Sequence, residues 1–364
     1  MKALKLFFPI VLLVLLPAAL FAQKYDEAGA RRAVQAYLDG MARGDSSSLL
    51  QAFDRAGFLD KVKADGTLER QPVPSFALSR NGKPLDPARF PGRIAKIDLN
   101  DNAGYAKVEL NWPDVRMVDY LALLRVGKEW KIVSKIWNEE RSGSGALPAD
   151  EAGIKQAVEA YFDAVTDNNK NAVKRAFHPD AFIMTSFGER LSRSPFQQWG
   201  AFADDKPSPE AKERQSKIVA IDQTGARAIA KVDLDWPDVH YIDYLSLMKF
   251  GGEWRIINKV WFSEPSARST VGVKDLMLPA AQLAPYLGKY AVDGRGFEVI
   301  VHENRLAVQS DGGMRFELKA QGNHEFALAM SPRDRIVFTV VNGKATQMEM
   351  RQVGRGPMVI KRAE

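Results

Sequence analysis

The chain has 364 residues, no cysteine, a formal net charge of +6 and 46% hydrophobic residues. The lack of cysteine excludes disulfides, iron–sulfur clusters, thiolate zinc sites and cysteine nucleophiles, so the fold depends on its own apolar cores. Basic and acidic residues alternate along the whole chain without a basic run. This distribution argues against a nucleic-acid partner, because such binding needs a concentrated basic patch.

The first 22 residues have the pattern of a secretory signal peptide. Lys2 and Lys5 supply a charged segment that precedes a nearly unbroken apolar run, Leu6–Leu16, and small residues follow the run. The run is too short for a comfortable membrane span. We expect cleavage after Ala22, a periplasmic or secreted protein, and no membrane span after cleavage. An uncleaved anchor is the alternative, because Leu20 stands third before the cut, where alanine fits better.

The strongest signal is an internal duplication. At an offset of 124, residues 28–45 align with 152–169, and residues 97–137 align with 221–261. Roughly half the positions in the second block are identical. One offset shared by both blocks indicates a duplicated domain.

Each copy predicts two helices followed by a curled antiparallel sheet. In the second copy, Asp150 is the expected cap of a helix whose apolar residues recur at helical spacing. A strand with alternating apolar residues ends at Pro237, and Gly251-Gly252 predicts a hairpin between the last two strands. The predicted organisation is signal peptide 1–22, domain 23–140, linker 141–149, domain 150–263, linker 264–275 and a small β domain 276–364.

The hairpin also predicts which side chains share a face. If Gly251-Gly252 is a two-residue turn, Tyr241 and Asp243 lie on one face with Trp254 and Asn258, and Lys259 lies on the other. The first face is the more apolar and is expected to be the one that the helices cover. The second face mixes polar and charged side chains, Lys259 among them, with apolar residues.

Three segments carry a family resemblance: AVEAYFDAVTDNN, AFHPDAFI and IDYLSLMKFGGEWRIINKVW. With them the repeat resembles the NTF2-like superfamily, and within it the putative lumazine-binding or SnoaL-like group. The resemblance implies an α+β fold with two tandem cone-shaped domains, each with helices packed on a curved antiparallel sheet. The more apolar face is then expected to line the cone. Because the other face often packs sheet to sheet in dimers of this superfamily, the resemblance also implies that the two copies form an intramolecular pseudo-dimer. The first copy departs from it, because residues 54–56 read Asp-Arg-Ala where residues 178–180 read His-Pro-Asp.

The end of the chain has a different pattern. Short strands alternate with turns, and Tyr286, Gly288 and Tyr290 follow Leu283 at close spacing. This segment resembles the small β domain appended to serine β-lactamase-like proteins. The resemblance implies a small all-β, barrel-like domain, through which a protein partner could dock.

Candidate site residues follow from the predicted cone-lining face. A buried carboxylate there is costly unless it is paired, so we predict that Asp119 and Asp243 bind a ligand donor or, for Asp243, act as a general base. The alternative is a role in the fold, with each carboxylate bonded to backbone N–H groups or to a helix residue. The predicted ligand-binding set is Asp119, Asp243, Tyr241, Trp236, Trp254 and Asn258.

Two histidines occur only in the second copy and are the other catalytic candidates. His178 and His240 could share one pocket with Asp180 and Asp243, although capping or surface roles are the alternatives. The chain has four histidines without His-x-His or Glu-x-x-His spacing, so no metal site is expected. Nucleotide and dinucleotide motifs are missing from the sequence, so no cofactor is expected.

These observations favour an exported, non-catalytic binding protein whose pockets take a small apolar or aromatic ligand. A structural or interaction module of an envelope assembly is one alternative. An isomerase, dehydratase or cyclase that uses a pocket aspartate as general base is the other. An open pocket would distinguish the binding protein from the structural module. The surroundings of Asp243 test the enzyme hypothesis.

Overall fold

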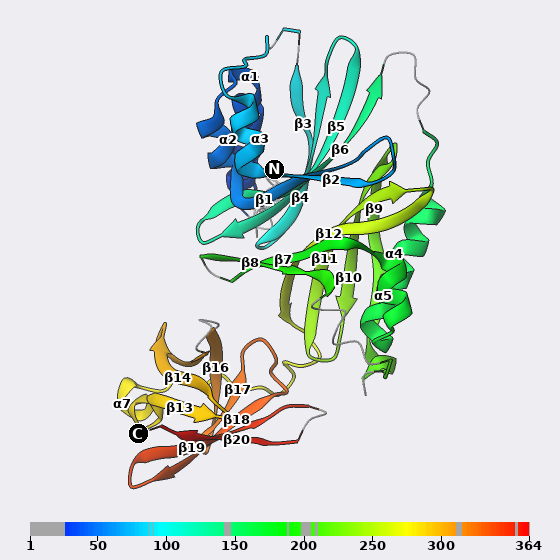
Figure 1. Cartoon of the computed structure of the whole chain (residues 1–364). Coiled ribbons are helices and arrows are strands. Elements are labelled where there is room, and N and C mark those ends of the chain that lie inside the picture. Colours follow the sequence, from blue (N-terminus) through cyan, green and yellow to red (C-terminus); the bar gives the residue numbers. More distant parts are fainter. Residues whose placement is uncertain are drawn as a thin grey trace, which may run out of the picture.

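The computed structural model describes residues 26–363 except 87, 90, 142–146, 188, 198–204, 208–209, 311–314 and 354–355. The predicted signal peptide therefore lies outside the described residues. The chain folds into two similar α+β domains and a closed β-barrel (Figure 1). In the described part of the chain, no helix is both long enough and apolar enough to cross a membrane.

The first domain is a six-stranded sheet with the order β2-β1-β6-β5-β4-β3, covered on one face by helices (Figure 1). Its elements are α1 (Glu27–Arg43), α2 (Ser46–Ala52), β1 (Phe53–Val62), β2 (Leu68–Pro72), α3 (Val73–Arg80), β3 (Gly92–Asn100), β4 (Ala103–Asn111), β5 (Val115–Val126) and β6 (Glu129–Arg141). The strand β1 runs parallel to β6, and the other pairs are antiparallel. The sequence predicted an entirely antiparallel sheet, and the observed sheet departs from that prediction at this one pair.

The second domain repeats this topology, with the strand order β8-β7-β12-β11-β10-β9. Its elements are α4 (Glu151–Asp167), α5 (Lys170–Ala176), β7 (Phe177–Phe187), β8 (Arg190–Pro195), η1 (Ala211–Glu213), β9 (Gln215–Thr224), β10 (Arg227–Asp235), β11 (Val239–Phe250) and β12 (Glu253–Pro265). Asp150 caps α4 as predicted, since its Oδ1 accepts from Gly153 N at 3.1 Å. Gly251 and Gly252 form the predicted turn with φ of 54° and 95°.

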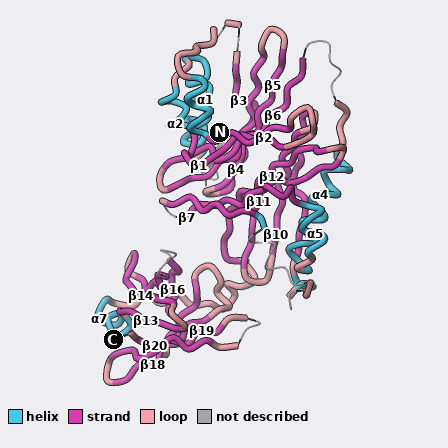
Figure 2. Tube along the Cα trace, viewed as in Figure 1, coloured by secondary structure: helices cyan, strands magenta, loops and turns pink. Residues whose placement is uncertain are grey.

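Each domain has its own apolar core between helices and sheet, and a third core joins the two sheets. This shared core contains no helix residue and includes Phe58, Tyr120, Met184, Ile229, Tyr244 and Val260. The helices of the two domains consequently lie on outer faces, with the sheets between them (Figure 2). The predicted intramolecular pseudo-dimer is confirmed.

Polar contacts at this interface obey the same pseudo-symmetry. Asp222 accepts from Lys107 Nζ at 2.6 Å and from Tyr120 Oη at 2.7 Å. Its counterpart Asp98 accepts from Lys231 Nζ at 2.6 Å and from Tyr244 Oη at 2.7 Å. Each aspartate lies 124 positions from its counterpart, so the duplication preserved the interface and not only the individual folds.

The C-terminal domain is a closed barrel of eight antiparallel strands, which confirms the predicted all-β domain. Its elements are α7 (Ala280–Leu283), η2 (Ala284–Tyr286), β13 (Gly288–Val292), β14 (Arg295–His302), β15 (Arg305–Ser310), β16 (Arg315–Gly322), β17 (Glu325–Leu328), β18 (Arg335–Val341), β19 (Lys344–Arg351) and β20 (Met358–Arg362). The barrel contacts the second domain through Arg333, which pairs with Glu210 at 2.9 Å and Asp238 at 3.4 Å.

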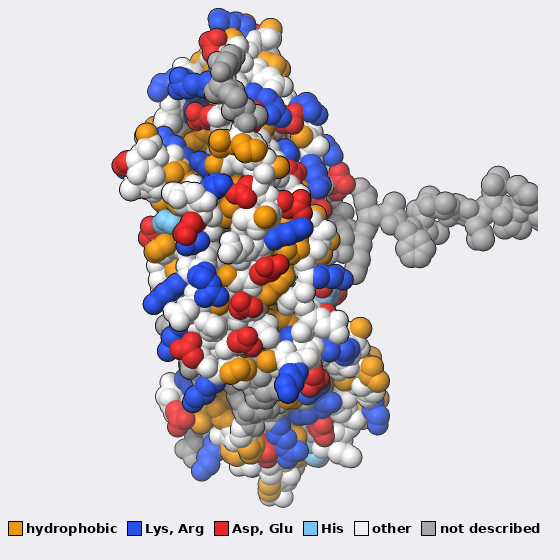
Figure 3. Space-filling model, turned by 90° about the vertical axis from the view of Figure 1, so that its right-hand side faces the viewer, with side chains coloured by type: hydrophobic (Ala, Val, Ile, Leu, Met, Phe, Trp, Pro, Cys, Tyr) orange, Lys and Arg blue, Asp and Glu red, His pale blue; other side chains and the backbone are white. Residues whose placement is uncertain are grey.

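The surface carries both signs of charge. On the face drawn in Figure 3, Lys and Arg side chains alternate with Asp and Glu side chains over all three domains. No single-sign field covers this face, in agreement with the alternating charges along the sequence.

Candidate functional site

Each cone contains a buried group of one tyrosine, one aspartate and one lysine, here called the triad. In the second domain, Tyr161 Oη donates to Asp243 Oδ2 at 2.5 Å. Lys259 Nζ donates to the same oxygen at 2.8 Å and to Tyr161 Oη at 2.9 Å. The three side chains therefore form a closed ring of hydrogen bonds that ties helix α4 to strands β11 and β12.

The first domain has the same triad 124 positions earlier. Tyr37 Oη donates to Asp119 Oδ2 at 2.6 Å, and Lys135 Nζ donates to that oxygen at 2.8 Å and to Tyr37 Oη at 2.7 Å. Both aspartates are fully buried. The interpretation that each aspartate bonds to a helix residue is thus confirmed, although the lysine was not anticipated.

A β-bulge brings Lys259 into the cone. The β11–β12 pairing follows the predicted register from the turn to Leu247–Ile256, and then shifts by one residue so that Ser246 pairs with Asn258. Because side chains alternate across a strand, one extra residue exchanges the faces of everything beyond it. The prediction that Lys259 points away from the cone is therefore wrong.

The same bulge changes the predicted place of Asn258. Its side chain is fully buried, does not line the cavity described below, and has no hydrogen-bond partner among the described residues. Beyond it, Lys259 and Trp261 belong to the cone, whereas Val260 belongs to the core between the sheets. The first domain has an equivalent bulge between Ala122 and Leu123.

The triad contains a buried ion pair. The carboxylate of Asp243 is removed from water, so the ammonium of Lys259 is the cation that compensates it. Burial, together with the charge of Asp243, raises the pKa of the Tyr161 phenol well above its ordinary value, so this hydroxyl stays neutral and donates. The second oxygen of Asp243, Oδ1, has no hydrogen-bond partner within the described residues.

Lys259 also forms part of the wall of a cavity of about 220 Å³ in the second cone. The ring centres of Trp261 and Tyr161 lie 5.0 and 5.3 Å from its Nζ, within cation–π range. An ammonium has three donors, and the two bonds within the triad leave one for the cavity. The lining consists of Tyr161, Val165, Ile183, Leu234, Trp236, Tyr241, Lys259 and Trp261.

Two cavity residues have defined electrostatic surroundings. Burial raises the pKa of Tyr241 to about 12, and the negative charge of Asp243 adds to this effect. The guanidinium of Arg214 lies 4.0 Å from the centre of the Trp236 ring and donates to the Val165 carbonyl at 2.6 Å. The cavity therefore presents aromatic surfaces, the neutral phenols of Tyr161 and Tyr241, and the amine group of Lys259.

The triad of the first domain is more enclosed. The Lys135 side chain is 6% exposed, compared with 13% for Lys259. Met117, which is 8% exposed, occupies the position of the partly exposed Tyr241. The two copies thus share the triad but differ in how much of it reaches a free surface.

The structure places the predicted ligand-binding residues in three different environments. Trp236 and Tyr241 line the cavity. Asp243 and Asp119 lie in the triads, behind the lysine and the tyrosine that occupy their Oδ2 atoms. Trp254 instead donates from Nε1 to Asp150 Oδ2 at 2.8 Å, where it fixes the start of α4.

The two candidate histidines do not join Asp243, so the predicted shared pocket is wrong. His178 stacks on Phe250 with ring centres 4.4 Å apart, and burial lowers the pKa of its imidazole. His240 lies between Asp233 at 3.0 Å and Glu264 at 3.2 Å, in a separate hollow of about 580 Å³. Neither histidine belongs to the lining of the Lys259 cavity, because each faces a side of the sheet other than the cone interior.

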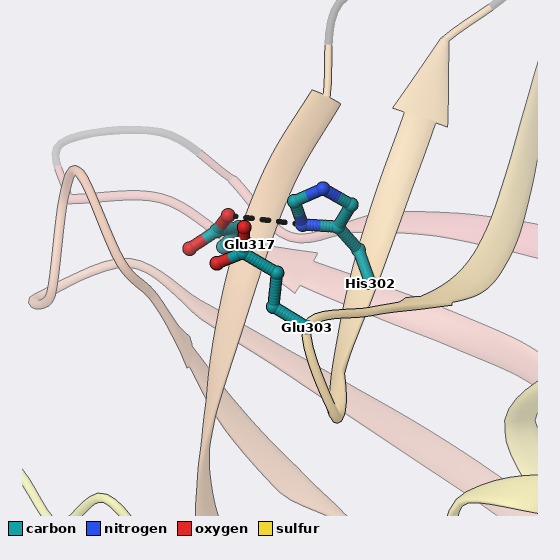
Figure 4. A group of neighbouring side chains, drawn as sticks. All are labelled: His302, Glu303 and Glu317. Atoms are coloured by element: carbon teal, nitrogen blue, oxygen red, sulfur yellow. Dashed lines mark ion pairs between the residues drawn. The ribbon is translucent and has the colours of Figure 1, made fainter.

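One group in the described part of the chain has the composition of a metal site. His302 on β14, Glu303 in the following turn and Glu317 on β16 converge within 4.8 Å of one another (Figure 4). His302 Nδ1 lies 3.3 Å from a Glu317 carboxylate oxygen. Glu303 is exposed and the other two side chains are half-buried, so the group is a partly solvated surface cluster.

Sequence reasoning missed Tyr161 and Lys259. The available signal was the duplication itself, since tyrosine and lysine recur at the same offset as the aspartate, at Tyr37 and Lys135. The face assignment concealed it, because a bulge leaves no clear mark in a strand of alternating residues.

Comparison with known proteins agrees with this architecture. The family described as putative lumazine-binding matches residues 25–138 and 149–262. A protein named aldolase FrzH, from a Cladobotryum species, is 25% identical over 105 residues, which cover 29% of this chain and 84% of that protein.

Solved structures also resemble single portions of the chain. An NTF2-like protein of unknown function from Shewanella baltica OS155 is 25% identical, with a TM-score of 0.29, and covers 32% of this chain and 94% of its own. Another, from Methylobacillus flagellatus KT, is 27% identical, with a TM-score of 0.28 and coverages of 32% and 97%.

Proposed function

Because the chain belongs to the putative lumazine-binding family, we propose that the cavity of its second domain binds a small planar molecule through Lys259. The observation that carries this proposal is the Lys259 amine group in a wall whose other described residues are aromatic or aliphatic. Pockets of this kind use apolar surface for affinity and one or two polar groups for orientation. The ligand expected is aromatic or conjugated, with a carbonyl or carboxylate oxygen that accepts from Nζ.

The larger hollow around His240 is a weaker candidate. Its charged side chains already pair with one another, because His240 contacts Asp233 and Glu264, and Lys217 pairs with Asp233 at 3.2 Å. A ligand there would have to break these pairs, whereas Lys259 has a donor left after its bonds within the triad. The electrostatics therefore support the smaller cavity.

Direct general-base catalysis by Asp243 has little support. Its Oδ2 accepts from both Tyr161 and Lys259, which stand between it and the cavity. Carbonyl compounds are nevertheless sensible ligands to test, because an amine lies in the wall and one relative is named an aldolase. Export to the periplasm or outside the cell stays part of the proposal, and cell fractionation tests it.

Native mass spectrometry of the protein purified from its own cell envelope tests the binding proposal. A small molecule retained by the folded protein and lost on denaturation supports it, and its mass identifies the chemical class. Trp236→Ala removes part of the cavity wall and is expected to weaken binding by roughly tenfold or more, in line with a lost aromatic contact of about 1.5 kcal/mol.

Trp112→Ala is the matched control, because Trp112 occupies the same position in the first domain. The two variants are compared by titration with the recovered ligand, followed by tryptophan fluorescence. Equal loss in both variants would contradict a site in the second cone.

A further inference from the structure

We propose that Lys259 captures small aldehydes or ketones as a reversible imine within this cavity. The inference rests on the proposed function, since it requires a ligand in the second cone, and it adds a covalent reaction of one named atom. Lys259 Nζ belongs to the cavity wall and is held from behind by Tyr161 and Asp243. An amine fixed in this way can meet a bound carbonyl carbon without a search through side-chain conformations.

The triad contains the proton acceptor that the amine needs. A nucleophilic lysine must be neutral, so the ammonium must first lose a proton. Asp243 Oδ2 lies 2.8 Å from Nζ and is fully buried. Transfer of one proton along this hydrogen bond converts two buried charges into a neutral amine and a neutral acid, and burial lowers the cost of that exchange because neither charge is solvated.

The reaction balances with no further reagent. The nitrogen lone pair of Lys259 forms a bond to the carbonyl carbon, and the carbonyl oxygen takes up a proton that the amine releases, giving a carbinolamine. The acid proton of Asp243 then reaches that hydroxyl through Tyr161, which lines the cavity: Tyr161 Oη takes the proton from Asp243 Oδ2 and gives its own proton to the carbinolamine. The carbon–oxygen bond breaks, and water leaves. A protonated imine remains beside the Asp243 carboxylate, so the buried ion pair is restored.

The surroundings suit an apolar carbonyl compound. Trp236, Trp261 and Tyr241 supply flat surfaces next to the amine. A cavity of about 220 Å³ has room for only a small molecule. The expected substrates are therefore small aromatic or short aliphatic aldehydes and ketones.

Lys135 is an internal control within the same chain. It has the equivalent partners, Tyr37 and Asp119, at nearly the same distances, 2.7 and 2.8 Å, but its side chain is only 6% exposed. If the triad alone made the amine reactive, both lysines would react. If access from the cavity is also required, Lys259 reacts and Lys135 does not.

The test uses the intact chain with benzaldehyde and cyanoborohydride, which reduces an imine to a stable secondary amine. Peptide mass spectrometry then compares labelling at every lysine over time. We expect Lys259 to be labelled at least about tenfold faster than Lys135 and the exposed lysines, a difference of only ~1.4 kcal/mol in barrier. Labelling of Lys259 no faster than that of Lys135 would overturn the inference.

Two additions separate this inference from the binding proposal. Benzyl alcohol has the same ring but cannot form an imine, so its binding reports the cavity alone. If benzyl alcohol binds but Lys259 is not labelled preferentially, the imine is refuted and the binding proposal is supported. If benzyl alcohol does not bind and Lys259 is not labelled preferentially, both proposals are refuted. Asp243→Asn keeps Lys259 and the approximate shape but removes the proton acceptor, and it is expected to slow labelling of Lys259 towards the rate of the exposed lysines.

Discussion

Removal of the triad lysine is the sharpest perturbation that the structure offers, because it can be made identically in both domains. Lys135→Met and Lys259→Met each keep an unbranched side chain of similar reach and delete only the ammonium. Each variant leaves a fully buried aspartate with a tyrosine hydroxyl as its remaining partner. The two experiments therefore ask the same question in two environments.

The expected magnitudes differ between the domains. Removing one member of a buried ion pair typically costs about 3–5 kcal/mol, because the remaining charge stays desolvated. Lys135 is 6% exposed and should fall near the upper end of this range. Lys259 is 13% exposed beside a cavity, so water can reach the orphaned carboxylate, and Lys259→Met should fall near the lower end or beneath it.

Urea unfolding provides the free energies, and hydrogen exchange of α1 and α4 peptides shows which domain has loosened. The double variants Lys135→Met/Asp119→Asn and Lys259→Met/Asp243→Asn are the controls. They should recover part of the loss, because no buried charge is then left unpaired. A cost of less than about 1 kcal/mol for Lys135→Met, or no recovery in its double variant, would refute the account of a compensated buried charge.

Two further predictions concern the interface and the cavity. Asp222→Ala deletes the acceptor of Lys107 and Tyr120 and should lower the free energy of urea unfolding by about 1–3 kcal/mol. Asp98→Ala should lower it by a similar amount, because Asp98 is the pseudo-symmetric counterpart of Asp222. A large difference between the two variants would contradict an equivalent interface. The pKa of Tyr241 is raised from 10.0 to about 12, so the stability that its neutral phenol contributes is complete below pH 10 and is lost as the pH rises towards 12. Tyr241→Phe should therefore lose less stability than the parent chain across that window, and an equal loss in pH-dependent unfolding would show that this phenol does not titrate there.

Much of the architecture could be predicted because its signals are local or repeated. Asp150 caps its helix, and Gly251 and Gly252 adopt the left-handed conformations that a tight hairpin requires. The pseudo-dimer was predicted from the family resemblance, because the second face of such sheets often packs against a partner sheet. Tyr120 and Tyr244 now lie in that interface, each with its hydroxyl bonded to an aspartate of the other domain.

The site was harder to predict, because it depends on one backbone irregularity and on partners distant in sequence. Asp243 was identified from its polarity on an apolar face, but its ring of partners comes from a helix 82 positions away and from a strand beyond a bulge. A single extra residue in β12 exchanged the roles expected for Asn258 and Lys259. Pattern rules assume an unbroken alternation, and one extra residue is enough to break it.

The duplication separates what the triad does for the fold from what it could do for function. Both copies keep tyrosine, aspartate and lysine in the same ring of hydrogen bonds, and both bury the aspartate completely. A feature common to an enclosed and a more open cone must serve the tie between helix and sheet that both cones need. Specialisation must then come from positions that differ around it, above all Met117 against Tyr241. The ammonium is in place in both domains, and access to it is what distinguishes the second.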